Sequence, residues 1–240
     1  MPLPGLALRP GRASGAAHLV DDPLLWASGR SEPPDVLSLP ALWWPPDTPA
    51  PPSTCAVLLQ GVPESTGPDS GYPILAGYDA DLFREGELVE VDGDGGTVTI
   101  AGVEEVGVVT VFLERSDGAI LLLERSERVG SFRGHWAGVS GFLEDPTPVD
   151  QALREVREET GLSGPDVRVA ASGAPVLARD GARIFVVHPF RFRVERSDVT
   201  LDWEHTRAEW VAPAEIRRRP TVPKLDRVWE AVAPESAPKG

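Results

Sequence analysis

The segment Gly141–Leu162, which reads GFLEDPTPVDQALREVREETGL, decides the fold of the second half of the chain. Its local chemistry sets the limits of a helix. Thr147 is a good N-cap residue, Pro148 fits the first helical position, and Asp150 sits where a capping-box acid reaches back to the cap. Gly161 tolerates the left-handed conformation that ends many helices. The segment therefore predicts an amphipathic helix between these limits.

The predicted helix has one apolar face and one acidic face. Its apolar residues follow the i, i+3, i+4, i+7 spacing of a stripe that packs against a sheet, and they are Val149, Ala152, Leu153 and Val156. Three carboxylates fall on the other side, those of Glu155, Glu158 and Glu159. A solvated acidic face is one interpretation of this cluster. A bound cation is the other, because it relieves the carboxylate repulsion, and hard oxygen ligands suit Mg²⁺ or Mn²⁺.

The end of this segment resembles the signature of the Nudix hydrolases. The signature runs Gly, five residues, Glu, seven residues, then Arg-Glu-aliphatic-x-Glu-Glu-x-Gly-aliphatic. Arg154–Leu162, REVREETGL, matches the second half at every fixed position. The resemblance extends over about Glu105–Val232. It includes Gly134-His135-Trp136 before the segment and, after it, Glu204-His205-Thr206 and Glu209-Trp210-Val211.

The resemblance implies a fold, a reaction and a set of site residues. For residues 104–240 it implies an α/β (α+β) fold, an α/β/α sandwich with a mixed sheet. The reaction is the metal-dependent hydrolysis of a diphosphate linkage in a nucleoside diphosphate derivative or related organic diphosphate, with Mg²⁺ or Mn²⁺ as cofactor. By the same resemblance Glu155 and Glu159 are the principal metal ligands. Glu158 assists as ligand or base, and Arg154 orients a glutamate through an ion pair.

The first half of the signature is changed in this chain. Gly141 lies thirteen residues before Arg154, where the family has fourteen, so the loop is one residue short. The position of the signature glutamate falls on Pro146 or Thr147, depending on the direction of counting. We therefore expect Glu144 or Asp145 to supply the auxiliary metal ligand from the shortened loop.

Further candidates for the site lie on either side of the helix. Glu204 and Glu209 lie where the family often places a general base, and His205 adjoins them; a surface position is the alternative for both acids. Three arginines precede the helix in an otherwise acidic chain, and we expect phosphate contact from among Arg125, Arg128 and Arg133. Trp136 is a candidate for stacking on a base, with core packing as the alternative.

Two other functions compete with the hydrolase. The isopentenyl diphosphate isomerases share the fold but resemble a site with a catalytic cysteine, and Cys55, the single cysteine, lies far outside the segment. A non-catalytic nucleotide-sensing or interaction module is the remaining alternative, which the shortened loop makes conceivable. Retention of Arg154 and the three glutamates argues against it. The sequence leaves the identity of the substrate open.

Residues 1–103 differ from the rest in composition and in the pattern of strands and turns, and we expect a smaller β-rich domain of unknown role there. The proline-rich stretch Pro33–Pro52 predicts an irregular, partly extended segment. From Ala56 to Ile100 short strands alternate with turns, which resembles in part the swivelling β/β/α domains of phosphotransfer proteins and hydro-lyase subunits. Asp92–Gly96, DGDGG, predicts a hairpin turn rather than a calcium loop, because the further ligands of such a loop are missing.

Composition limits the classes of partner. The chain of 240 residues is 41% hydrophobic and 25% charged, as in ordinary globular proteins. A net charge of −14 opposes binding to nucleic acid through an extended basic surface, so we expect a small-molecule diphosphate as ligand. No apolar run reaches the roughly 18 residues of a membrane helix, and we expect a cytoplasmic protein without membrane contact. Nothing in the sequence opposes a homodimer.

Overall fold

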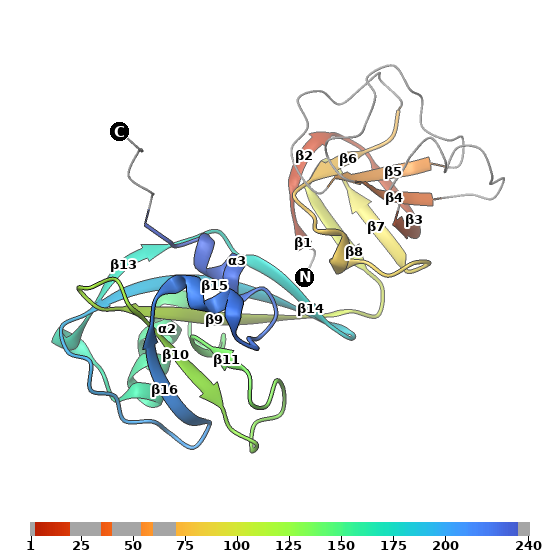
Figure 1. Ribbon diagram of the computed structural model, residues 1–240. Coiled ribbons are helices and arrows are strands. Elements are labelled where there is room, and N and C mark those ends of the chain that lie inside the picture. Colours follow the sequence, from red (N-terminus) through yellow and green to blue (C-terminus); the bar gives the residue numbers. More distant parts are fainter. Residues whose placement is uncertain (1–2, 20–34, 40–53, 60–70, 235–240) are drawn as a thin grey trace. The chain divides into compact units, whose positions relative to one another are not determined.

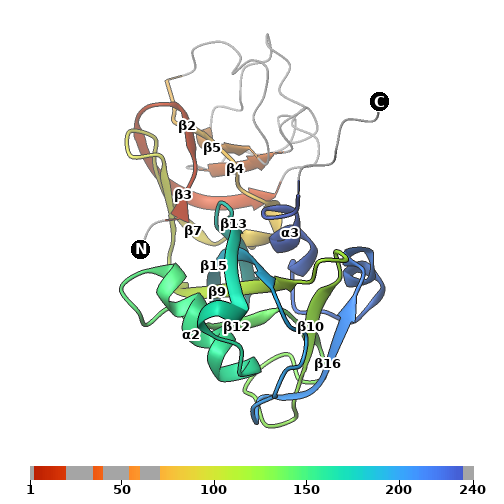
Figure 2. The same cartoon turned by 90° about the vertical axis from the view of Figure 1, so that its left-hand side faces the viewer.

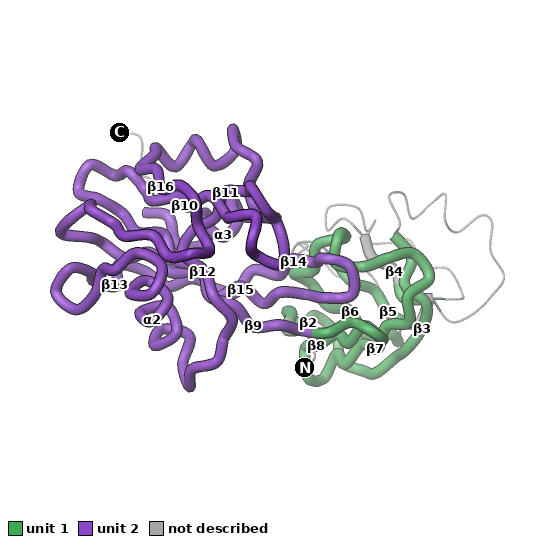
Figure 3. Tube along the Cα trace, turned by 90° about the horizontal axis from the view of Figure 1, so that it is seen from below, with its two compact units in different colours: residues 1–104 green, residues 105–240 purple. Residues whose placement is uncertain are grey.

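The computed structural model describes residues 3–19, 35–39, 54–59 and 71–234. The chain divides into two compact units, Met1–Glu104 and Glu105–Gly240 (Figure 3). Each unit is described by itself.

Unit 1 is built on one sheet whose two ends meet (Figure 1). Its strands are β1 (Leu3–Pro4), β2 (Leu6–Arg9), β3 (Arg12–Leu19), β4 (Asp35–Leu39), β5 (Thr54–Leu59), β6 (Ile74–Ala76), β7 (Leu88–Asp92) and β8 (Thr97–Ile100), in the order β1-β8-β7-β3-β4-β5-β6-β2. Strands β3 to β6 run parallel, whereas the pairs at both ends are antiparallel. Since only Gly5 separates the edge strands β1 and β2, the sheet must curl back on itself.

Gly5 is required where the sheet closes. A Cβ at this position would lie 2.4 Å from the ring of Tyr78. That ring is fully buried, and its hydroxyl donates a hydrogen bond to the carbonyl of Leu3 at 2.9 Å. The glycine therefore lets an aromatic side chain fill the junction between the two edges.

The β-rich character expected for the N-terminal region is confirmed. The predicted turn at Asp92–Gly96 is also present, because the Asp92 carboxylate accepts hydrogen bonds from the amides of Asp94 and Gly95. Within Pro33–Pro52, expected to be irregular, residues Asp35–Leu39 form β4 and the remainder lies outside the described residues.

Unit 2 is a sheet with helices on both faces (Figures 1 and 2). Its strands are β9 (Glu104–Glu114), β10 (Ile120–Arg125), β11 (Trp136–Ala137), β12 (Val139–Phe142), β13 (Val167–Ser172), β14 (Val176–Asp180), β15 (Arg183–Val194) and β16 (His205–Val211). The main path is β11-β10-β9-β15-β13; β12 pairs with β9, β14 with β15, and β16 with β10. The helices are α2 (Pro148–Thr160) and α3 (Leu225–Glu230), with the short 3-10 helices η3 (Gly164–Asp166) and η4 (Pro213–Arg218).

Alternation along the central strands sorts side chains onto the two faces of this sheet. One core cluster packs Ala152 and Val156 of α2 against Val109, Val111, Leu113, Leu121 and Leu123. The other packs η4 and α3 against intervening residues of the same strands, namely Phe112, Ile120 and Leu122. The sheet therefore lies between α2 on one side and η4 with α3 on the other, which confirms the predicted sandwich.

Helix α2 begins and ends at the predicted residues. Thr147 Oγ1 accepts a hydrogen bond from the amide of Asp150, and Gly161 has a left-handed φ of 72°. The predicted apolar stripe needs one correction, since Leu153 is 41% exposed. The buried face is rotated toward Gln151 and Glu159, because both side chains take part in a polar network at one edge of the sheet.

We expect residues 102–240 to fold without unit 1, because both core clusters of the sandwich lie within that range. Circular dichroism of a fragment beginning at Gly102 checks this. An unfolded fragment beside a folded full-length chain would contradict it.

None of the helices in the described residues is both long and apolar enough to cross a membrane.

Candidate functional site

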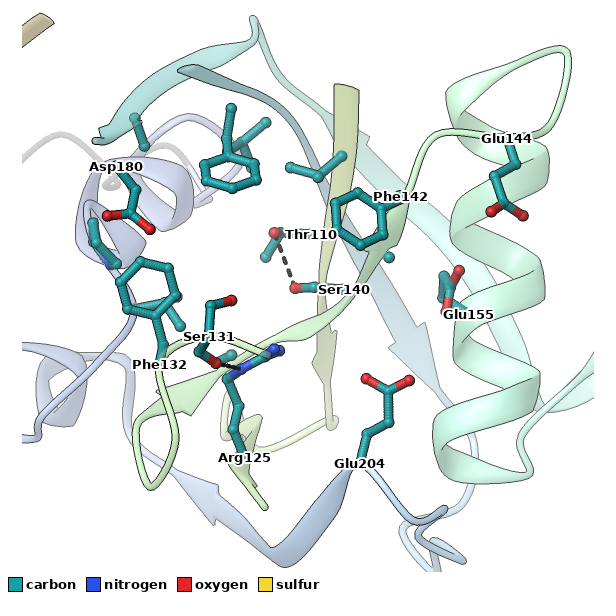
Figure 4. Close-up of a pocket in the computed structure, with 18 of the residues that line it drawn as sticks. Thr110, Arg125, Ser131, Phe132, Ser140, Phe142, Glu144, Glu155, Asp180 and Glu204 are labelled. Carbon is teal, nitrogen blue, oxygen red and sulfur yellow. Dashed lines mark hydrogen bonds between the residues drawn. The ribbon is translucent and has the colours of Figure 1, made fainter. Parts of the chain in front are cut away.

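A pocket of about 320 Å³ opens in unit 2 beside α2 (Figure 4). Its lining comes from β9, β10, β11, β12, β14, β15, α2 and the loops that precede β11, α2, β16 and α3. Its size lies at the lower end of the roughly 300–1,000 Å³ typical of small-molecule sites. Among the predicted site residues, the lining includes Arg125, Glu144, Arg154, Glu155, Glu158 and Glu204.

The carboxylates of α2 form the acidic side of the pocket. Glu155 and Glu158 line it, while Glu159 is buried with 3% exposure and accepts a hydrogen bond from the amide of Ser140 at 3.3 Å. Burial raises the pKa of Glu155, and the charges of Glu158 and Glu204 raise it further. Burial, then Glu155, Asp202 and Glu204, raise the pKa of Glu159 well above its usual value. Repulsion among these acids therefore adds to the effect of burial on both pKa values.

The donor set fits a hard divalent cation. Carboxylate oxygens are the ligands that Mg²⁺ and Mn²⁺ prefer, and a cation would stabilise the ionised form that burial and, to a smaller extent, neighbouring acids disfavour in Glu155 and Glu159. Within the described part of the chain, no three His, Cys, Asp or Glu side chains lie close enough together to hold a metal ion as they stand. Mg²⁺ is commonly held by one or two carboxylates together with water and the phosphate oxygens of a substrate, which needs no such cluster.

Gln151 ties the shortened loop to the helix. Its side chain is fully buried, and its amide oxygen accepts hydrogen bonds from the backbone amides of Glu144 at 2.9 Å and Asp145 at 3.0 Å. The same oxygen accepts from Arg154 Nη2 at 2.7 Å, and Gln151 Nε2 donates to Glu155 Oε1 at 2.5 Å. The neutral side chain of Gln151 thus holds both the backbone of the shortened loop and Glu155, a candidate metal ligand.

Arg154 pairs with both acids of the loop. Its Nη2 lies 3.1 Å from Glu144 Oε2, and its Nε lies 3.0 Å from Asp145 Oδ2. The hydrogen bond with Glu144 raises the pKa of the guanidinium. Arg154 therefore orients loop carboxylates, those that we expected to replace the missing glutamate.

Gly141 faces the helix at the closest point of the loop. A Cβ at this position would lie 2.0 Å from Glu155 Oε1. The Glu155 side chain would have to shift to make room for any other residue at this position.

The candidate bases differ sharply in position. Glu204 lines the pocket, and burial together with Asp202 raises its pKa. Glu209 lies outside the lining and pairs with Arg219 at 2.7 Å and Arg207 at 2.5 Å, which hold its pKa low. Glu204 is therefore the better candidate of the two.

His205 is enclosed between two acids. Its side chain is 1% exposed, with Nδ1 3.1 Å from Asp202 Oδ1 and Nε2 3.9 Å from Glu159 Oε2. Burial lowers its pKa. The imidazole lies outside the pocket lining, and its contacts with the site are those with Asp202 and Glu159.

The predicted arginines separate into one pocket residue and two loop residues. Arg125 lines the pocket, and its Nε donates to the carbonyl of Ser131 at 3.1 Å (Figure 4). Arg128 and Arg133 lie outside the lining, and Arg133 Nε donates instead to the carbonyl of Val129. Of the three arginines from which we expected phosphate contact, Arg125 is the one that lines the pocket.

Of the two roles considered for Trp136, the structure shows core packing. It is 6% exposed, belongs to the core cluster that includes α3, and has the guanidinium of Arg219 4.5 Å and that of Arg207 5.4 Å from its ring centroid. Core packing is therefore its role, and no face remains for a substrate base.

Sequence reasoning missed several residues that line the pocket. Phe132, Phe142, Asp180 and Phe185 all contribute to the lining. They come from separate elements, and no local spacing connects them. The backbone of Phe132, with a φ of +50°, and the 57% exposure of Phe142 become informative only once the fold is known.

We expect simultaneous replacement of the loop acids, Glu144→Gln with Asp145→Asn, to weaken Mn²⁺ binding without unfolding the chain. The change removes two negative charges beside the acidic face of α2 and leaves the Gln151 bonds to the loop backbone intact. Titration calorimetry with Mn²⁺ measures the affinity. An unchanged affinity would exclude these acids as replacements for the missing glutamate.

Comparison with known proteins finds a family match and several similar structures. The NUDIX domain family model matches residues 104–231. Similar solved structures include a MutT protein from Methanosarcina mazei Go1, at 23% identity, 53% coverage of this chain, 92% of that chain and a TM-score of 0.46. The E. coli ORF135 protein matches at 26% identity, with coverages of 55% and 91% and a TM-score of 0.43. A C. elegans Ap4A hydrolase matches at 17% identity, with coverages of 54% and 94% and a TM-score of 0.44.

No curated protein matches the sequence. The family model covers more than half of the chain, including every strand and helix of unit 2 that forms the pocket. The chain therefore belongs to the NUDIX-domain family.

Proposed function

We propose that the chain hydrolyses a diphosphate linkage in a nucleoside diphosphate derivative, with Mg²⁺ or Mn²⁺ as cofactor. The family match supports a pyrophosphohydrolase-type activity. The observation that carries the finer proposal is the convergence of Glu155, Glu158 and Glu204 on one pocket that also presents Arg125. Carboxylates for a cation and a guanidinium for phosphate oxygens are the two groups that diphosphate chemistry needs.

Each residue has a distinct task in this proposal. Glu155 and Glu159 hold the cation, with Glu158 and Glu144 as further oxygen donors. The bound cation neutralises charge on the phosphoryl oxygens and lowers the pKa of water. Arg154 is a positioning residue, since its contacts are with the loop acids and Gln151.

Glu204 is the proposed general base. It reaches the pocket from the loop before β16, opposite the helix, so it can accept a proton from water bound on the α2 side. Its raised pKa brings it nearer the working range of a base. Glu158 remains the alternative, because it lines the same pocket from the helix.

A non-catalytic nucleotide sensor is the second candidate. The shortened loop and the separation of the acids among the described residues favour it. Wild-type protein assayed against a panel of diphosphates with Mg²⁺ and with Mn²⁺, with products identified by mass, separates the two functions. We expect metal-dependent turnover that Glu204→Gln reduces strongly. Nucleotide binding without turnover would establish the sensor instead.

A further inference from the structure

The two sides of the pocket differ in chemistry. Glu144 and Glu155 lie on the α2 side, whereas Asp180 and Phe132 lie on the side away from that helix (Figure 4). If the diphosphate and cation occupy the acidic side, the rest of the substrate extends toward Asp180. This step rests on the proposed function.

The side away from α2 offers a surface for a flat apolar ring. The register of β14 with β15 pairs Ala178 with Phe185 and, two residues along, Asp180 with Arg183. Residues two apart on a strand share a face, so Ala178, Asp180 and Phe185 project from the same face of the hairpin. All three line the pocket, as does Phe132 from the loop before β11. Aromatic rings in such a place bind bases by stacking.

Asp180 is the polar group of this hairpin face that remains available to a ligand. Its side chain makes no hydrogen bond or ion pair with any residue that the structure describes, and it is exposed. An ionised carboxylate accepts hydrogen bonds through two adjacent oxygens and donates none. It therefore complements a ring edge with two adjacent N–H groups.

Among the common bases, only guanine has an edge with two adjacent N–H groups. Guanine presents N1–H and the 2-amino group side by side. Adenine and cytosine place a ring acceptor next to their amino group, and uracil flanks its single N–H with carbonyls. A carboxylate facing any of these three meets an acceptor, which repels it.

We propose that Asp180 is a specificity-determining residue that selects a guanine base by accepting from N1–H and the 2-amino group, with the base stacked against Phe132. The Phe132 ring contributes affinity for any base, and Asp180 contributes the choice among bases.

Replacement of Asp180 by Asn is expected to change which base the site prefers, rather than only to weaken the binding of guanine. An amide offers one acceptor and one donor. Xanthine, with N1–H beside a carbonyl, complements that pair. We expect wild-type protein to prefer GTP over ITP and XTP in kcat/KM by at least about 10-fold, the scale of a hydrogen bond to a charged group. Asp180→Asn should lose this preference and favour XTP.

Binding of the monophosphates GMP, IMP and XMP, measured by calorimetry, provides a readout that is independent of turnover. It should show the same order and the same reversal. Phe132→Leu should weaken all three without changing their order, and Asp198→Asn, which removes an exposed acid outside the pocket, should change nothing.

The outcomes separate the two proposals. If no diphosphate is hydrolysed but GMP binding reverses in Asp180→Asn, the proposed function fails and the role of Asp180 stands. Hydrolysis with equal preference for all bases, or faster hydrolysis of diphosphates that lack a base, would overturn the role of Asp180. An unchanged preference in a folded Asp180→Asn protein would do the same.

Discussion

Replacing either Glu155 or Glu159 by Gln is expected to lower kcat by on the order of 10²-fold or more, because an oriented metal site supplies several kcal/mol of transition-state stabilisation. Gln keeps the shape and helix propensity of Glu but lacks the negative charge that a cation requires. The measurement is metal-dependent turnover of the best substrate. Glu195→Gln, at an exposed position outside the pocket, is the matched control.

Folding of the metal-free protein should respond in the opposite direction. The folded-state pKa values of Glu155 and Glu159 are raised, so above a pH of about 4.5 the folded chain retains protons that the unfolded chain releases. The contribution of these two groups to the stability of the metal-free wild type therefore falls as pH rises from that value through their folded pKa values. The Gln variants lack this contribution and should show an equal or higher Tm at pH 7.

The pair of measurements decides how the two acids act. Reduced turnover with an equal or higher Tm identifies metal ligands. Full turnover in both variants would mean that the cation is held elsewhere. A lower Tm at every pH would show that the buried carboxylate of Glu159 is a structural acceptor for Ser140.

The largest expected effect on stability lies away from the pocket, at Arg191. Its Nη1 is 2.7 Å from Glu114 Oε2, its Nε donates to the carbonyl of Val232 at 2.8 Å, and both charged side chains are about 10% exposed or less. Arg191→Met leaves the carboxylate buried without this partner. Breaking such a pair costs about 3–5 kcal/mol, so we expect Tm to fall by roughly 10 °C or more.

Two further variants test whether an unpaired buried charge causes the loss of stability in Arg191→Met. Arg193→Met removes a guanidinium that lies 3.7 Å from the same carboxylate but is 59% exposed, and it should cost little. The double replacement Glu114→Leu with Arg191→Met removes both charges, and it should recover much of the loss. If the double variant is no more stable than Arg191→Met, cavity formation rather than an unpaired charge explains the effect.

Local chemistry predicted the parts of the fold that depend on neighbours in sequence. The ends of α2 follow from Thr147 and Gly161, because caps act within a few residues. Strands such as β10 follow from short apolar runs between turns. The strand β3 was missed, because Arg12–Leu19 mixes glycine, serine and alanine and gains its burial only from partners that lie distant in sequence.

The pocket residues likewise divide into those that local sequence could predict and those that depend on distant parts of the chain. Glu155, Glu158 and Arg154 belong to one helix and could be grouped from its periodicity. For Trp136 the sequence left stacking on a base and core packing both open, because its surroundings include Arg207 and Arg219 from far along the chain. Asp180 was missed for the same reason: only the pairing of β14 with β15 brings a hairpin end to the pocket.

The bonds of Gln151 have a consequence for the order in which this molecule folds. They join partners only three to seven residues away, so little chain entropy opposes their formation once α2 exists. Glu204 instead depends on its backbone bond to Ser126 and on β16 joining β10, contacts of long sequence separation that form slowly. During refolding we therefore expect protection of the Glu144 and Asp145 amides from hydrogen exchange to precede that of the Ser126 amide, so that the acidic half of the pocket exists before its opposite wall.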